Sequence, residues 1–214
     1  MIKNSFFLIF FCLLFSLSAV AQKEAPFSEE MKQEMCNKVK EAAQHAWKGY
    51  KDYAWGADDL KPLTKNSKIW YKTSMLMTPV DAFDTFTLLG LTTEAKEAKD
   101  LILTKLDFNI DNDVQVFEIT IRLLAGLVTA YEMDGDKKFL TLAKDLGNRL
   151  MPAFNSKTGM PYRFVHLQTG KTRDGINNPA EIGTLMMEFG KNKKITGNKK
   201  YYNAARKAMM YVYN

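Results

Sequence analysis

Hydrophobic residues recur at the three- and four-residue spacing of amphipathic helices along most of the chain. The first such segment begins at Ser28, continues through Glu29 and Glu30, and keeps this spacing as far as Tyr53. A hydroxyl residue followed by two acids is a typical helix start, because the hydroxyl caps free backbone N–H groups and the acids complement the helix dipole. The sequence therefore predicts a long first helix over residues 28–53.

Capping residues and polar breaks divide the rest of the chain into further helices. Thr78 before Pro79 predicts a capped helix start, and Gly90 predicts the end of the same helix. The other predicted helices span about 93–105, 114–133, 136–150, 178–196 and 199–214. Loops are expected over residues 58–66 and 152–177, the latter with a short hairpin around residues 160–167.

Two of the predicted helix pairs resemble each other in sequence. Residues 118–122 are echoed by 181–185, and residues 134–139 are echoed at nearly the same offset by 196–201. A repeated helix–turn–helix unit cannot bury its apolar face alone and stacks against neighbouring units. The sequence therefore predicts an all-α array of helical hairpins, either an open solenoid or a closed α/α toroid. The lack of a short, strict repeat favours the toroid.

The first residues have the pattern of a secretory signal peptide. Lys3 supplies a positive charge, residues 6–17 form an apolar run, and residues 19–21 read as a small-residue cleavage site. The run is too short to span a bilayer comfortably, so we expect no stable membrane insertion after cleavage. The sequence predicts removal of residues 1–21 and a secreted or periplasmic protein that begins at residue 22.

Composition and charge exclude some classes of function. The apolar fraction of 46% and the charged fraction of 25% are ordinary for a soluble globular protein. The net charge is +6, but no basic stripe with interleaved aromatic residues is evident, which argues against nucleic-acid binding. After signal cleavage Cys36 is the only cysteine, so an internal disulfide is impossible, and its place on an amphipathic helix predicts a buried side chain.

The predicted helix over 114–133 carries the most informative charged pair. Apolar residues cover nearly its whole circumference, which is typical of a buried helix, yet it contains Glu118 and Arg122. These two side chains are four residues apart and share one helix face. They form either a plain structural ion pair or part of a ligand-lined cavity. Burial would raise the pKa of a carboxyl group and the arginine would lower it, and spacing alone leaves both outcomes open.

Other polar residues have structural explanations. Glu181 occupies the third position of its helix, where it completes a capping box with Asn178, and Asp81 near a helix start complements the helix dipole. His45 and His166 lack partners at zinc-ligand spacing, so no metal site is assigned. What remains is carboxylates and aromatic residues on paired helices, the combination that carbohydrate hydrolysis uses.

Five segments, in order along the chain, resemble glycoside hydrolase family 47, the α-1,2-mannosidases and their relatives. Together they extend over most of the chain that follows the signal peptide. The matching stretches are 47–62, 80–91, 116–131, 153–162 and 180–189.

The resemblance implies a fold, an activity and residue roles. It implies an (α/α)7 barrel and calcium-dependent hydrolysis, with inversion, of α-1,2-linked mannose in mannose-containing oligosaccharides or glycoprotein glycans. By motif, Glu118 corresponds to the catalytic acid, and Arg122 and Glu181 correspond to residues lining the sugar subsite. A family domain is about twice as long as this chain, so residues 22–214 are expected to form its N-terminal half. The further catalytic carboxylates and the calcium-binding threonine are expected outside this chain.

Three functional interpretations follow. The first is the N-terminal half of an exported α-mannosidase. The second is a catalytically inactive relative that binds mannose-rich glycans, and the third is a helical-repeat interaction protein unrelated to sugars. The first interpretation predicts that Glu118 and Arg122 face the axis of a helical ring, away from its outer surface.

Overall fold

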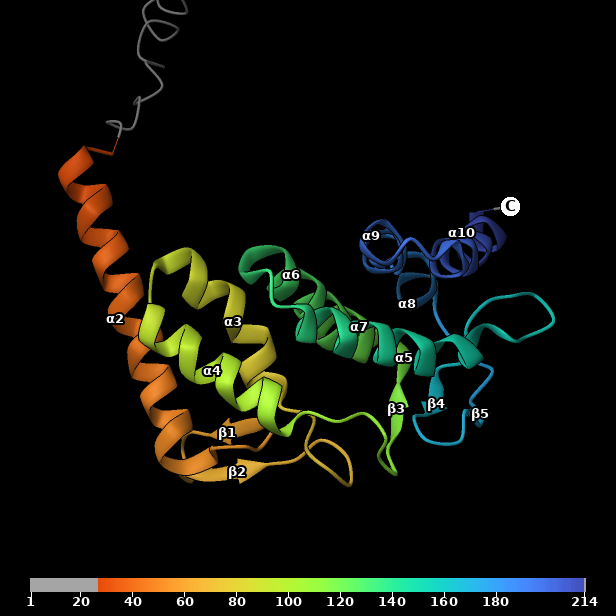
Figure 1. Ribbon diagram of the computed structural model, residues 1–214, viewed down its shortest axis with the longest axis horizontal. Coiled ribbons are helices and arrows are strands. Elements are labelled where there is room, and N and C mark those ends of the chain that lie inside the picture. Colours follow the sequence, from red (N-terminus) through yellow and green to blue (C-terminus); the bar gives the residue numbers. More distant parts are fainter. Residues whose placement is uncertain (1–26, 214) are drawn as a thin grey trace, which may run out of the picture. The chain divides into compact units, whose positions relative to one another are not determined.

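The computed structural model describes residues 27–213, and the predicted signal peptide lies outside these residues. Figure 1 shows a chain built mainly of helices with a few short strands. The chain divides into two compact parts, Met1–Val39 and Lys40–Asn214, which are described separately. Within residues 27–213, no helix combines the length and apolar character needed to cross a membrane.

The predicted first helix is confirmed as α2, Glu29–Ala54. Its start is capped as expected, because the Ser28 hydroxyl accepts a hydrogen bond from the Met31 amide at 3.1 Å. In the part up to Val39, Cys36 is exposed, so the prediction that it is buried is wrong. Periodicity shows which residues share a helix face, but it does not show whether another element covers that face.

Residues 40–213 form three helical hairpins in sequence. Helix α3 packs against α4, α6 against α7, and α9 against α10, while α3 also contacts α6 and α6 contacts α9. The first helices of the three hairpins therefore form one row. The bounds are α3 Met77–Leu89, α4 Thr92–Lys105, α5 Val116–Ile119, the π-helical stretch η1 Thr120–Leu124, α6 Ala125–Asp134, α7 Lys137–Leu150, the 3₁₀ turn η2 Met151–Phe154, α8 Pro179–Gly183, α9 Met186–Thr196 and α10 Lys199–Tyr213.

Two small antiparallel sheets replace parts of the predicted loops. One sheet pairs β1 (Asp59–Lys61) with β2 (Asn66–Lys68), and the other has the order β3 (Asp113–Gln115), β4 (Phe164–His166) and β5 (Thr172–Arg173). The predicted hairpin near residues 160–167 therefore lies a few residues further along the chain. These strands are two or three residues long and mostly polar, so no alternation in the sequence could indicate them.

The helix predicted over 114–133 is interrupted. Residues 113–115 form β3, the helix starts at Val116, and η1 at Thr120–Leu124 is π-helical before α6 continues the rod. A π-helical turn contains one more residue per hydrogen-bonded loop than an α-helical turn, and such turns are frequent at functional sites. Glu118 and Arg122 lie in α5 and η1, where the irregularity occurs.

The start of α3 also differs from the prediction. The helix begins at Met77, and the preceding Leu76 adopts a left-handed conformation with φ of 56°. Thr78 does not cap the helix, because its hydroxyl donates a hydrogen bond to the main-chain oxygen of Asp58 at 2.6 Å. The predicted end is confirmed, since Gly90 closes α3 with φ of 70°.

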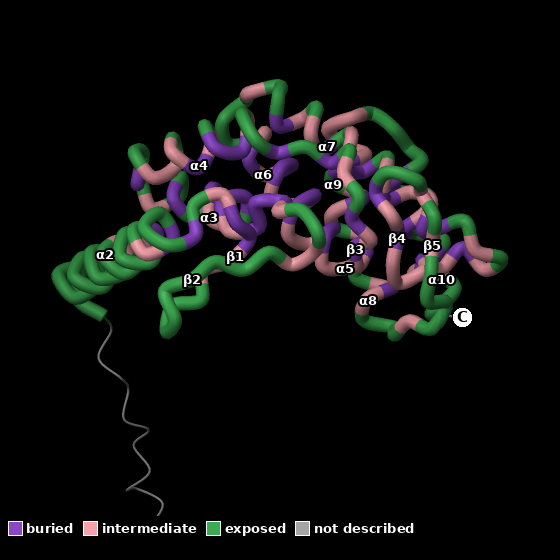
Figure 2. The backbone as a smooth tube through the Cα atoms, turned by 90° about the horizontal axis from the view of Figure 1, so that it is seen from below, coloured by how far each residue is buried: buried purple, intermediate pink, exposed green. Residues whose placement is uncertain are grey.

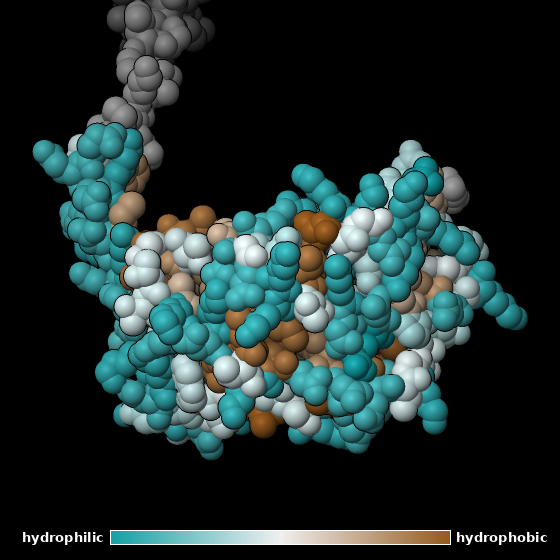
Figure 3. Space-filling view, viewed as in Figure 1, coloured by the Kyte–Doolittle hydropathy of each residue, from teal (hydrophilic) through white to brown (hydrophobic). Residues whose placement is uncertain are grey.

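The core lies where the helices of neighbouring hairpins face each other, as the buried residues in Figure 2 show. Leu123, Leu124 and Leu127 are fully buried, and the rings of Phe83 and Phe139 lie 5.2 Å apart between the first and second hairpins. Figure 3 shows hydrophobic surface, coloured brown, exposed between hydrophilic areas on this face of the protein.

A glycine allows the close contact between α3 and α6. A Cβ atom at Gly126 would lie 2.6 Å from Val80 Cγ1 and 3.2 Å from the Val80 main-chain oxygen. We predict that Gly126→Ala lowers the free energy of unfolding by about 1–3 kcal/mol, because overpacking forces the two helices apart. Urea denaturation of both proteins measures this change.

The matched control is Gly190→Ala in α9. A Cβ atom at Gly190 would meet nothing closer than Tyr202 at 4.0 Å. Alanine is the better helix former by about 1 kcal/mol, so this variant is expected to be neutral or more stable. Equal destabilisation by the two substitutions would show that helix contact at Gly126 is not the cause.

Candidate active site

Two neighbouring helices bring three charged side chains together. The Arg122 Nε atom donates a hydrogen bond to Glu118 Oε2 at 2.9 Å, and Arg122 Nη1 donates to Asp81 Oδ2 at 3.2 Å. Glu118 and Arg122 come from α5 and η1, whereas Asp81 comes from α3. The side chain of Glu118 is 27% exposed, and those of Arg122 and Asp81 are each 38% exposed. The group is therefore accessible to a ligand.

The role predicted for Asp81 is therefore incomplete. Because α3 starts at Met77, Asp81 lies beyond the first turn of the helix. Its carboxylate forms an ion pair with Arg122. Burial raises the pKa of Asp81 despite the opposing effect of Arg122. Arg122 is thus shared by two carboxylates from different helices.

An aromatic wall borders this group. The Arg122 guanidinium lies 5.2 Å from the centre of the Trp70 ring, and the Trp70 indole N–H donates a hydrogen bond to Asp59. Next to Trp70, the Tyr71 hydroxyl accepts a hydrogen bond from the Gln115 amide at 3.2 Å, and burial raises the Tyr71 pKa. Aromatic rings beside carboxylates suit a ligand with both apolar and hydroxyl faces. Nothing in the local sequence spacing indicated that Trp70 contacts Arg122.

Glu181 lies in a second polar group. The Asn178 side chain accepts a hydrogen bond from the Glu181 amide at 3.0 Å, which is half of the predicted capping box. The Glu181 carboxylate does not complete the box, because it pairs with Arg163 at 3.3 Å while the Asn178 amide binds Asn177. Glu181 is only 13% exposed, and within residues 27–213 its Oε2 atom has no hydrogen-bond partner. A buried carboxylate oxygen without a partner is costly, which is consistent with a ligand group being its missing donor.

The two polar groups are connected through the backbone. The main-chain oxygen of Arg163 accepts a hydrogen bond from the Val116 amide at 2.9 Å, at the edge of the β3–β4 pair. Arg163 is therefore fixed to the first residue of α5, two residues before Glu118, while its side chain holds Glu181. The structure brings Glu118 and Arg122 into direct contact and places Glu181 in a separate ion pair.

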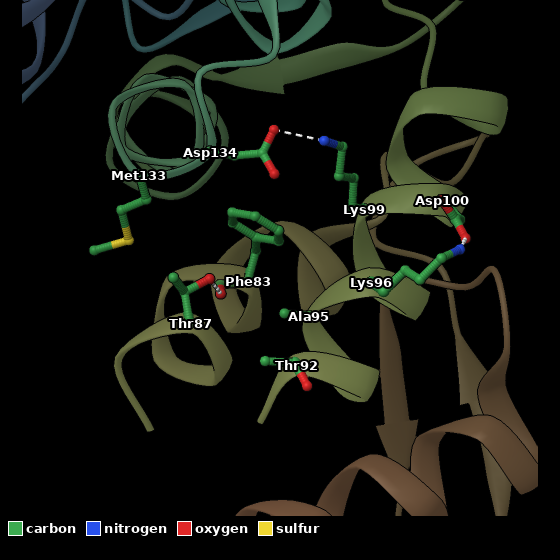
Figure 4. A pocket seen from close by; sticks show the side chains of 9 residues that line it. All are labelled: Phe83, Thr87, Thr92, Ala95, Lys96, Lys99, Asp100, Met133 and Asp134. Carbon is green, nitrogen blue, oxygen red and sulfur yellow. Dashed lines mark hydrogen bonds and ion pairs between the residues drawn. The ribbon is translucent and has the colours of Figure 1, made fainter. Parts of the chain in front are cut away.

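The pocket drawn in Figure 4 is a different site. It has a volume of about 490 Å³ and lies between α3, α4 and the end of α6, lined by residues such as Phe83, Thr87 and Met133. Its charged side chains pair with each other, as Lys99 does with Asp134 at 2.5 Å. None of the predicted site residues lines it.

No metal site is apparent in the part of the chain that the structure describes. Residues 27–213 contain no group of three or more histidine, cysteine, aspartate or glutamate side chains placed to hold an ion. These residues therefore do not assemble a carboxylate cluster of the kind that can bind calcium.

Residues 42–214 match the profile of glycosyl hydrolase family 47. The chain belongs to this family. Similar relatives include two endoplasmic reticulum mannosyl-oligosaccharide 1,2-alpha-mannosidases. The protein of Rattus norvegicus is 39% identical over 94% of this chain and 30% of the rat protein. The protein of Homo sapiens is 40% identical over 79% of this chain and 24% of the human protein. The chain thus spans less than a third of the length of these relatives.

A solved structure supports the same assignment. The alpha-1,2-mannosidase from Trichoderma reesei is 28% identical, with a TM-score of 0.76 over 82% of this chain and 40% of that chain. The predicted fold class is therefore confirmed: the helical hairpins form part of the (α/α)7 barrel of family 47. The first helices of the hairpins, which carry Glu118 and Asp81, are the row that holds the candidate site.

The partly buried carboxyl of Glu188 is expected to make the stability of the protein depend on pH. Burial raises the pKa of Glu188 above its usual value of 4.5, and its Oε2 atom lacks a hydrogen-bond partner within residues 27–213. The folded protein therefore favours the protonated carboxyl, and stability is lost as the pH rises through the raised pKa. We predict that Glu188→Gln is as stable as the unmodified protein at acid pH and more stable at neutral pH.

Thermal denaturation across this pH range measures the difference between the two proteins. Glu41→Gln is the control, because it removes the same charge from an exposed position on α2. A Glu188→Gln variant without a pH-dependent advantage would contradict the effect of burial on this carboxyl.

Proposed function

We propose that this chain is the N-terminal part of a calcium-dependent, inverting α-1,2-mannosidase that acts on mannose-rich oligosaccharides. The observation that carries the proposal is the contact of Glu118 with Arg122 and Asp81 in an accessible site of a family 47 fold. The named activity of the rat, human and Trichoderma reesei relatives supports it. Because the chain covers only part of each relative, the activity is proposed for the whole protein that contains residues 22–214.

In this proposal Glu118 is the catalytic acid. Its proton passes to the glycosidic oxygen as the bond from that oxygen to the anomeric carbon breaks. A water molecule attacks the anomeric carbon from the opposite face and loses its proton to a carboxylate base, which inverts the configuration. No described residue is assigned as the base, and we place it in another part of the protein.

Arg122 and Glu181 bind and orient the sugar. Arg122 fixes the direction of the Glu118 carboxylate through Oε2, so that Oε1 remains available to the leaving oxygen. Glu181 offers its unpartnered, buried Oε2 atom as an acceptor for a sugar hydroxyl. Calcium dependence is proposed from the family alone, and no step is assigned to the ion because the described residues include no carboxylate cluster that could hold it.

The proposed location is outside the cytoplasm. The signal pattern over residues 1–21 predicts export to the periplasm or the medium. Mannose-containing glycans exposed there would be the substrates.

We predict that Glu118→Gln in the complete gene product lowers the rate of mannose release from α-1,2-mannobiose by about 100-fold or more, because general acid catalysis contributes a factor of that order. Glu132→Gln is the control, since it makes the same change on α6 at a residue that pairs with Lys191. Full activity of Glu118→Gln would reject the assignment. Tight glycan binding without release by the unmodified protein would support the inactive binding relative instead.

The stereochemistry and the metal requirement have their own test. Proton NMR during hydrolysis is expected to show β-mannose as the first product, and a calcium chelator is expected to abolish release until calcium is added back. Initial α-mannose would exclude inversion. Unchanged activity in the chelator would exclude the calcium requirement.

A further inference from the structure

The segment over residues 69–76 connects β2 to α3 and forms a wall of the candidate site. It carries Trp70, whose ring faces the Arg122 guanidinium, and Tyr71, whose hydroxyl binds the Gln115 amide. The segment has no regular secondary structure. Its conformation must therefore be set by other contacts, because a backbone outside helices and sheets still requires partners for its buried polar groups.

One set of contacts comes from Asp58. This residue is 0% exposed. Its Oδ2 atom accepts a hydrogen bond from the Trp70 amide at 2.9 Å, and its Oδ1 atom accepts from the Met75 amide at 2.7 Å. The Ser74 hydroxyl at 3.1 Å and the Met77 amide at 3.3 Å also donate to Oδ1. A single buried carboxylate thus joins both ends of the segment.

The second set comes from Asn112, which is also 0% exposed. Its side-chain oxygen accepts hydrogen bonds from the amides of Lys72 at 3.1 Å and Thr73 at 3.0 Å, and its side-chain nitrogen donates to the Thr73 oxygen at 2.8 Å. The main-chain oxygen of Asn112 accepts a hydrogen bond from the Leu167 amide at 2.9 Å, next to β4. The middle of the segment is therefore fixed to the second sheet.

These contacts explain two costly features. A buried carboxylate is tolerated when several donors surround it, and Asp58 has four. A left-handed leucine persists only where its surroundings hold it, and the Met75 and Met77 amides on either side of Leu76 both bind Asp58. The segment is thus held in one conformation by two buried side chains.

We propose that Asp58 and Asn112 are positioning residues that hold Trp70 and Tyr71 in place against the Glu118–Arg122–Asp81 group before a ligand binds. Neither residue is assigned to touch the ligand. The effect on ligand binding rests on the proposed function, because the ligand used to measure it is a mannoside. The effect on the segment itself does not.

Hydrogen–deuterium exchange of the full chain tests the effect on the segment. Asp58→Asn replaces one acceptor oxygen by a donor, and Asn112→Asp removes the donor to Thr73. We expect exchange over residues 70–77 to rise about tenfold or more in both variants, because leaving a buried polar group without its hydrogen-bond partner typically shifts an opening equilibrium by about that factor. Exchange over α7, residues 137–150, is expected to stay unchanged.

Two further variants keep the test decisive. Ser74→Ala removes one of the four bonds to Asp58 and is expected to give a smaller rise confined to the same segment. Asp107→Asn is the control, because Asp107 is exposed and accepts a single local bond from the Asn109 amide. Unchanged exchange over 70–77, or an equal rise throughout the chain, would overturn the proposal.

Binding of α-1,2-mannobiose to the complete gene product, followed by tryptophan fluorescence, separates positioning from a purely structural role. The Asp58 and Asn112 variants are expected to bind at least tenfold more weakly than the unmodified protein. Unchanged affinity despite faster local exchange would overturn the positioning role. If the unmodified complete gene product does not bind the disaccharide, the proposed function fails, and exchange alone decides whether the two residues hold the segment.

Discussion

The structure depends on the close packing of the first helices of neighbouring hairpins. Gly126 lets α6 approach the backbone of α3 at Val80, one residue before Asp81. At that separation Arg122 can pair with Asp81 on α3 as well as with Glu118, which precedes it on the same helical rod. A wider gap between the helices would separate Asp81 from Arg122 and Glu118. The polar group of the site is therefore a consequence of how tightly the apolar faces meet.

The sequence predicted the regular part of the fold well. The helix starts at Ser28 and Asp136 and the end at Gly90 are confirmed, because capping is a local interaction between residues close in sequence. The short strands, the start of α3 and the exposure of Cys36 were missed or wrong. The strands are too short to show alternation, and periodicity does not show whether a helix face is covered. The start of α3 depends on a partner distant in sequence, as the bond from Thr78 to Asp58 illustrates.

The candidate site shows the same division. Glu118 and Arg122 were found together because they share a helix face, and the family resemblance added their proposed roles and that of Glu181. Spacing could not indicate that Asp81 and Trp70 complete the group, since they approach Arg122 from other elements. It also suggested a capping box for Glu181, whereas the side chain turns to Arg163.

The number of residues in the π-helical stretch Thr120–Leu124 determines the direction of a side chain that precedes it. Successive residues of an α-helix are rotated by about 100°, so the extra residue in the wide turn sets the phase of α5 relative to α6. Deletion of one residue here would restore a regular helix and turn Glu118 by about that angle with respect to the buried face of α6. The orientation of the proposed acid is thus encoded by the number of residues in this turn as well as by their identity.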